Sequence, residues 1–179
     1  MCDSKTGMDK DNCYRGLAEN FMSTNPQKSV EICSKMSDKT SKDNCLNNII
    51  GNPEIVKANV DLSVSICDAL TLKDRCYNYI AGVISGTDIK QAAKICQKLS
   101  DEVQVYSCYN GIWFASNTVV ISNYDFTISL CNFLTLKKDE CLRKMAGEFM
   151  NSDRTKAAAI CNLMSASGAS GCLQDVNRG

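Results

Sequence analysis

The chain of 179 residues has no histidine, two prolines, one tryptophan and no excess of either charge, with 20 basic and 20 acidic residues. Without an imidazole, nucleophiles of the Ser–His and Cys–His types are excluded. No C-x-x-C pair, G-x-S-x-G, phosphate loop or dinucleotide fingerprint occurs, which argues against zinc, redox and nucleotide sites. Because the charge is balanced, no excess of positive charge is available to attract a phosphate backbone, and nucleic acid is not an expected partner. We therefore expect no catalytic residue, no cofactor, no metal and no enzymatic activity.

Long apolar runs are also missing, and none approaches the roughly 18 residues that a membrane span needs. The first ten residues are polar and charged, so they do not form a signal peptide. Either a signal peptide has been removed or the chain is cytosolic. Twelve cysteines in even pairs are typical of a disulfide framework, which persists in oxidising compartments. We expect an extracellular or cell-surface protein.

The cysteines are spaced as six copies of one pattern. Each copy has a small residue, Ile or Leu, Cys, and Leu or Met at fixed offsets, then a polar gap, a second Cys and an aliphatic residue four positions later. The second cysteine follows the first by 9 to 12 positions, and the next pair begins 20 to 23 positions later. A period of about 32 residues is typical of arrays of supersecondary units. The pairs are Cys2/Cys13, Cys33/Cys45, Cys67/Cys76, Cys96/Cys108, Cys131/Cys141 and Cys161/Cys172.

Both halves of the pattern have helical spacing. Ala92, Ile95, Cys96 and Leu99 recur at i, i+3, i+4 and i+7, which is one face of an α-helix. Each copy is thus predicted to hold a helix A that ends just after its cysteine, and a helix B that begins near the second cysteine. The predicted fold class is all-α, an α-solenoid of about six antiparallel helix hairpins, each joined by a disulfide. We expect a single repeat domain over 1-179, with repeats near 1-25, 26-52, 53-86, 87-122, 123-151 and 152-179.

Helix-capping residues support these boundaries. Asn25 and Asn52 each precede a proline, which places an N-cap before proline at the first helical position. Asp88 and Asp153 precede two further A helices, and Gly51 lies where a B helix is expected to end.

Two disulfide schemes fit the hairpin geometry. If each cysteine pairs with its nearest partner, six short loops close, each contributing about 2–3 kcal/mol in the chain-entropy model. If each B cysteine instead pairs with the next A cysteine, Cys13 bonds to Cys33, and Cys2 and Cys172 are left to bridge neighbouring subunits. We favour the nearest-partner scheme. Peptide mapping without reduction distinguishes the two.

One segment is almost free of charge. The 34 residues from Val103 to Leu136 contain a single charged side chain, Asp125, and many aromatic and β-branched residues. Some of them occupy helix positions and need no function beyond the core. The rest exceed what one helical stripe can hide, and contiguous exposed apolar surface usually marks an interface. Core and interface therefore both stay open, and the interface candidates are Trp113, Phe114, Val119, Val120, Ile121, Tyr124 and Phe126.

The pattern resembles disulfide-linked α-hairpin repeats of the Sel1-like and tetratricopeptide-like type. The stretches that carry the resemblance are 88–96 and 155–161, which look like the end of a cysteine-rich helix A, with Cys108 and Cys172 in the place of the helix B cysteine. The repeat here is shorter, and the Leu-Gly and Tyr positions of those families are irregular. The resemblance implies an α-solenoid used for binding, without a transferable ligand site.

The ends of the chain suggest the first functional hypothesis. The first copy begins at Cys2 with no helix A before it, and the last copy ends seven residues after Cys172. A repeat end without a cap exposes its packing face, on which another copy can stack. The chain is equally explained as a segment of a longer array. We expect a structural or assembly protein that associates with itself head-to-tail, as a filament or ring. The alternative is a solenoid binding module for a peptide or protein partner at the cell surface.

Overall fold

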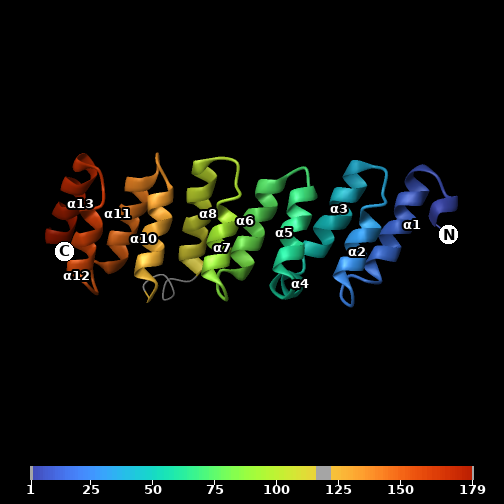
Figure 1. Ribbon diagram of the computed structural model, residues 1–179, viewed down its shortest axis with the longest axis horizontal. Helices are drawn as coiled ribbons and strands as arrows, with labels where there is room; N and C mark the ends of the chain where they lie inside the picture. The colour runs from blue at the N-terminus through green and yellow to red at the C-terminus, as the bar shows by residue number, and fades with distance from the viewer. Residues whose placement is uncertain (1, 116–121, 179) are drawn as a thin grey trace. The chain divides into compact units, whose positions relative to one another are not determined.

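The structure is a computed structural model that describes residues 2–115 and 122–178, with only the backbone of residues 114 and 115. The protein is 76% helical, and its described residues form twelve α-helices, one short 3₁₀ helix and no strand (Figure 1). The predicted all-α class is confirmed. The chain divides into two compact units, Met1–Ile84 and Ser85–Gly179, each with its own core.

The first unit contains one 3₁₀ helix and six α-helices. They are η1 (Cys2–Ser4), α1 (Gly7–Glu19), α2 (Pro26–Cys33), α3 (Lys39–Ile50), α4 (Pro53–Ala58), α5 (Val60–Ala69) and α6 (Lys73–Ile84).

The second unit contains six described α-helices. They are α7 (Ile89–Cys96), α8 (Glu102–Ala115), α10 (Tyr124–Phe133), α11 (Lys138–Phe149), α12 (Arg154–Cys161) and α13 (Ala166–Arg178).

The N-caps predicted from the sequence are confirmed. In each case the side-chain oxygen of the cap accepts a hydrogen bond from a backbone N–H of the first turn, at 2.8 to 3.0 Å. This satisfies one of the donors that a helix N-terminus leaves without a partner. The caps are Asn25 before α2, Asn52 before α4, Asp88 before α7 and Asp153 before α12.

One expected A helix is divided into two. Where a single helix was expected to follow Pro53, α4 ends at Ala58 and α5 begins at Val60, with Asn59 at φ −140° and ψ 58° between them. The N–H of Asn59 donates to the Ile55 carbonyl at 2.9 Å, while its own carbonyl accepts from the Ser63 N–H at 3.0 Å. Asn59 therefore ends one helix and begins the next, and its own N–H and carbonyl both keep helical hydrogen bonds.

Each of the six disulfides lies within one hairpin. They join Cys2 to Cys13, Cys33 to Cys45, Cys67 to Cys76, Cys96 to Cys108, Cys131 to Cys141 and Cys161 to Cys172, and no cysteine is free. These are the nearest-partner pairs. Five of them connect the end of one helix to the first turns of the next, and the first connects η1 to α1. Eleven of the twelve cysteines are buried, and Cys13 is partly exposed.

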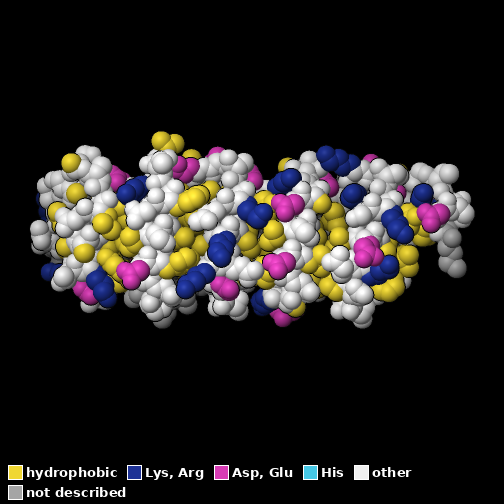
Figure 2. Space-filling model, viewed as in Figure 1, with side chains coloured by type: hydrophobic (Ala, Val, Ile, Leu, Met, Phe, Trp, Pro, Cys, Tyr) yellow, Lys and Arg dark blue, Asp and Glu magenta, His cyan; other side chains and the backbone are white. Residues whose placement is uncertain are grey.

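The apolar faces of the helices are buried inside each unit. In the first unit Leu46 and Ile49 of α3 and Ile80 of α6 are at most 1% exposed. In the second unit Leu142 and Phe149 of α11 are equally buried. Apart from Asp11, no charged side chain of the described residues is buried, and basic and acidic side chains are interspersed on the face that Figure 2 shows. The hydrophobic burial of each unit is thus supplied by the positions that the helical periodicity indicated.

A carboxylate of one hairpin also holds the turn of the next hairpin, at four places in the described chain. In the first unit Asp11 accepts from the backbone N–H groups of Ser37 and Asp38, at 3.0 and 2.9 Å, and is 1% exposed. The other three carboxylates accept from the hydroxyl and the N–H of a Ser or Thr that follows the last buried Leu or Met of helix A. These pairs are Asp43 with Thr71, Glu102 with Thr135, and Asp139 with Ser165.

These hydrogen bonds stabilise the charged form of the carboxylates. The Ser37 and Asp38 N–H groups hold the pKa of Asp11 below its ordinary value. The Thr135 hydroxyl lowers the pKa of Glu102, and the Ser165 hydroxyl lowers that of Asp139. Packing between successive hairpins is therefore specified by ionic hydrogen bonds as well as by apolar contact.

Candidate functional site

The interface candidates from the charge-poor segment are only partly exposed. Trp113 is 4% exposed and packs beside Tyr109, with ring centroids 6.3 Å apart. Tyr124 and Phe126 are half-buried on α10, and Tyr124 meets the Phe149 ring edge-on at 5.5 Å. The Phe114 side chain and Val119, Val120 and Ile121 lie outside the described residues. The structure therefore places Trp113 in the core, and it does not bring the seven candidates together on one described surface.

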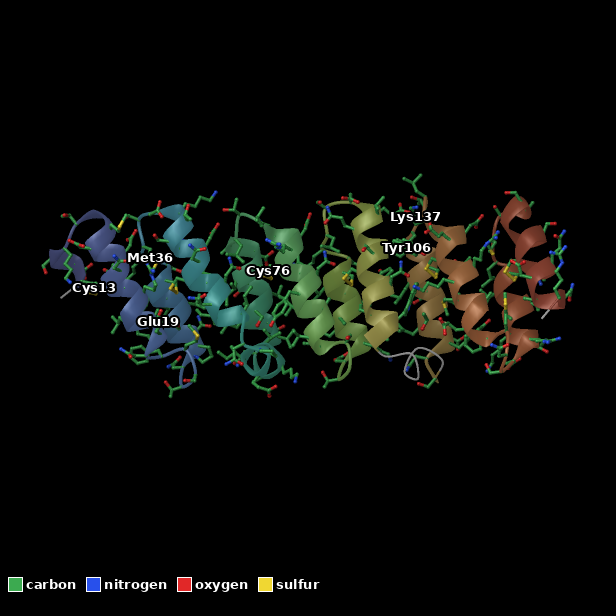
Figure 3. All side chains as sticks on the ribbon, turned by 180° about the vertical axis from the view of Figure 1, so that it is seen from behind. Cys13, Glu19, Met36, Cys76, Tyr106 and Lys137 are labelled. Carbon is green, nitrogen blue, oxygen red and sulfur yellow. A yellow bond between two sulfur atoms is a disulfide. The ribbon has the colours of Figure 1, made fainter. Side chains whose placement is uncertain are left out.

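A concave groove lies in the first unit. It lies between α3 and α6, and it has a volume of about 730 Å³. These are two B helices of successive hairpins, and the end of α5 lies at the base of the gap between them. Cys76, labelled in Figure 3, stands at the start of α6 beside the groove and is bonded to Cys67 of α5. The groove thus has one disulfide at its base.

The groove has an apolar floor and polar rims. Ile50, Leu70 and Cys76 form the floor, and they are 8% exposed or less. Residues of α3 at successive turns form one rim, and the start of α6 and the turn before it form the other. The α3 rim contains Lys39, Thr40, Asp43, Asn44 and Asn47, and the α6 rim contains Leu72, Arg75 and Tyr79.

The two ends of the groove differ in charge. Lys39 and Arg75 lie near the N-termini of α3 and α6, where the helix dipole is positive. Neither forms an ion pair within the described chain. Asp43 is the one acidic residue of the lining, and its carboxylate accepts the Thr71 hydroxyl at 2.5 Å. At the other end, the Tyr79 hydroxyl donates to the Gly51 carbonyl at 3.3 Å and connects the two rims.

Between α8 and α11, aromatic side chains stand at two of the corresponding positions. When Cys45 is matched with Cys108, Asp43 corresponds to Tyr106 and Ile50 corresponds to Trp113. Both aromatic side chains are buried. The Nζ atom of Lys137 lies 5.9 Å from the Tyr106 ring centroid (Figure 3). The Nζ atom of Lys144 lies 5.8 Å from the Trp113 ring centroid. Helix pairs with the same cysteine pattern therefore differ in the side chains that they carry at the groove positions.

The sequence analysis did not identify the groove residues. One signal in the sequence could have indicated them, the tetrapeptide Leu-Thr-Leu-Lys that follows both Cys67 and Cys131. Its first leucine is buried in both copies, whereas the second is exposed, with Leu72 at 65% and Leu136 at 84%. An apolar residue that is exposed in both copies is not explained by the core. Leu72 forms part of the groove rim.

No family model matches this chain, and no curated protein or solved structure is similar to it. Function must therefore be inferred from the geometry alone.

Proposed function

We propose that the protein is a non-enzymatic extracellular binding module. In this proposal the disulfide-joined hairpins form a helical repeat array, and the groove between α3 and α6 binds a peptide segment of a partner protein. The observation that carries the proposal is the groove itself, with its apolar floor and its rims of unpaired cations and amides. Peptide and ligand sites typically have volumes of about 300–1,000 Å³ and combine apolar walls with a few polar groups, and the groove agrees on both points.

Rigidity supports the same function. The Cys33–Cys45 disulfide fixes the start of α3, and the Cys67–Cys76 disulfide fixes the start of α6. The hydrogen bond between Asp43 and Thr71 joins the two hairpins beside the groove. A groove whose walls are fixed before binding loses little conformational entropy when the partner arrives, and this favours affinity.

The compartment is consistent with this role. Six disulfides fit an extracellular or secreted protein, where oxidised cysteines persist. Among the described helices, none has the length and apolarity required to cross a membrane. We therefore place the partner outside the cell or at its surface.

Head-to-tail self-association, the function expected first from the sequence, stays a prediction. The exposed residues of α13 are mostly small or polar, and no large apolar side chain of that helix is exposed. The exposed polar residues of α13 include Ser167, Ser170, Gln174, Asp175 and Asn177. Stacking of one copy on another needs an apolar contact face. Within α13 no such face is exposed.

Filling the groove tests the proposal. A display library of random peptides is selected against the oxidised full-length protein, and enriched peptides are measured by fluorescence anisotropy. Asn44→Trp and Asn47→Trp each place an indole in the groove, and we expect at least tenfold weaker binding. Asn48→Trp is the matched control, because Asn48 is an exposed neighbour on α3 that does not line the groove.

Two results would overturn the proposal. One is a selection that enriches no peptide. The other is a set of peptides whose affinity is unchanged by Asn47→Trp while far-UV circular dichroism shows an intact helical fold. A protein that elutes only as polymers would instead support head-to-tail association.

A further inference from the structure

We infer that the groove between α3 and α6 selects an acidic segment of its partner, in which apolar side chains are followed by carboxylates. The apolar side chains occupy the floor, and the carboxylates lie between Lys39 and Arg75. This inference rests on the proposed function, and it adds the chemical class of the segment that is bound.

Charge supports an acidic partner. Lys39 on α3 and Arg75 on α6 line opposite rims near the same end of the groove, and neither is neutralised by an ion pair in the described structure. The positive ends of both helix dipoles lie there as well. The only acidic lining residue, Asp43, is already engaged by the Thr71 hydroxyl and N–H. Two cations against this single carboxylate give the lining a net positive charge.

The floor specifies the apolar part of the segment. Leu70 and Ile50 are 4% exposed at the base of the groove, while Leu72 and Tyr79 are 65% and 39% exposed on the α6 rim. Exposed apolar side chains beside a concave apolar floor gain hydrophobic free energy when a ligand side chain covers them. The segment therefore needs one or two aliphatic side chains in addition to its acidic groups.

The amides of the α3 rim suit a peptide backbone. Asn44 and Asn47 lie three residues apart on one face of α3, both are exposed, and neither side chain forms a hydrogen bond within the described chain. A carboxamide can donate to a carbonyl and accept from an N–H at once, which is what a peptide group requires. The two amides thus bind the main chain without selecting its side chains.

The second unit provides an internal contrast. When Cys76 is matched with Cys141, Arg75 corresponds to Glu140 and Leu72 corresponds to Lys137. Lys137 Nζ pairs with Glu140 at 2.7 Å. At the position of the Arg75 cation the second unit thus has an acidic residue, and the neighbouring lysine is already paired with it. We expect acidic peptides to bind the first unit alone.

The test uses four labelled peptides with Gly-Ser flanks and the cores Leu-Leu-Glu-Glu, Leu-Leu-Gln-Gln, Leu-Leu-Lys-Lys and Ser-Ser-Glu-Glu. Affinities are measured by fluorescence anisotropy with the oxidised full-length protein at low and high salt. Because two exposed charge pairs are gained, the first peptide should bind about fivefold more tightly than the glutamine peptide at low salt. The lysine peptide and the serine peptide should bind more weakly still.

Charge reversal tests the preference for acidic peptides more directly. In Lys39→Glu/Arg75→Glu the order of the glutamate and lysine peptides should invert. The control Lys28→Glu/Lys35→Glu changes the same charge on exposed lysines of the first unit that do not line the groove, and it should keep the wild-type order.

The outcomes distinguish a failure of acidic selection from a failure of groove binding. Equal affinity for the glutamate and glutamine peptides, or an order that charge reversal does not change, would overturn acidic selection and leave groove binding intact. If no core peptide binds, the peptides enriched from the random library decide, because an absence of acidic residues among them overturns acidic selection. If the library enriches nothing, both proposals fail. Dimers that Asn47→Trp abolishes would assign the groove to a second copy of the chain and overturn the acidic segment.

Discussion

Removal of one disulfide gives a direct measure of how far the cross-links stabilise this fold. The change is Cys161→Ala/Cys172→Ala, which opens the last hairpin, far along the chain from the groove. Its cysteines are separated by 11 positions and are fully buried. In the chain-entropy model, a loop of this length destabilises the unfolded chain by about 2.8 kcal/mol. Loss of two buried sulfur atoms adds up to about 1 kcal/mol.

The expected loss of about 3–4 kcal/mol is large against the typical total stability of a domain, about 5–15 kcal/mol. The same model assigns about 16 kcal/mol to all six disulfides together. Short helices of 6 to 14 residues are marginal by themselves. The cross-links therefore decide whether the second unit stays folded.

The assay is guanidinium unfolding followed by far-UV circular dichroism without reductant, with intact mass confirming that the other cysteines stay paired. The slope against denaturant should rise, because the opened chain exposes more surface when unfolded. Ser170→Ala, an exposed position on the same helix, should change stability by less than about 0.5 kcal/mol. A loss below about 1 kcal/mol in the double variant would refute the reasoning.

Two further predictions concern packing and pH. Phe149→Ala should destabilise the protein by about 3–5 kcal/mol because Phe149 is 1% exposed, whereas Phe133→Ala, at 55% exposed, should cost less than about 1 kcal/mol in the same unfolding experiment. The carboxylates whose pKa is lowered by the fold stabilise it only while they are charged, so stability should be constant near neutral pH and decline as the pH falls below about 4. Asp139→Asn should lower stability at neutral pH and flatten the acid decline in urea titrations, and an unchanged decline would contradict the role of its bond to Ser165.

Local features of the fold could be predicted because they depend on near neighbours in sequence. Asn25 and Asp153 start helices through a bond to an N–H three residues away, and the cysteine pairs close short loops. The division of helix A at Asn59 could not be predicted, because the residues on both sides have helical spacing. There Asn59 keeps a hydrogen bond to each helix, through its N–H to Ile55 and through its carbonyl to the Ser63 N–H.

The groove was not predictable for a different reason. A groove is the space that remains between two helices, and it depends on which side chains fail to fill that space. Leu70 and Leu72 belong to the same tetrapeptide, yet Leu70 is buried and Leu72 lies exposed on the groove rim. Trp113 is a second case, because the charge-poor segment around it left core and interface both open, and its position on α8 directs it into the core, 4% exposed. The helices could be predicted from the sequence pattern, whereas the residues exposed at the surface depend on how the helices pack against one another.

The disulfides lie inside hairpins, and none joins one hairpin to the next. Proteolysis will therefore leave different products at the two kinds of loop. A cut in the turn between α12 and α13 leaves both pieces attached through Cys161 and Cys172, and it becomes visible only on a reducing gel. A cut between α11 and α12 is bridged by no sulfur, so it releases a separable fragment under either condition.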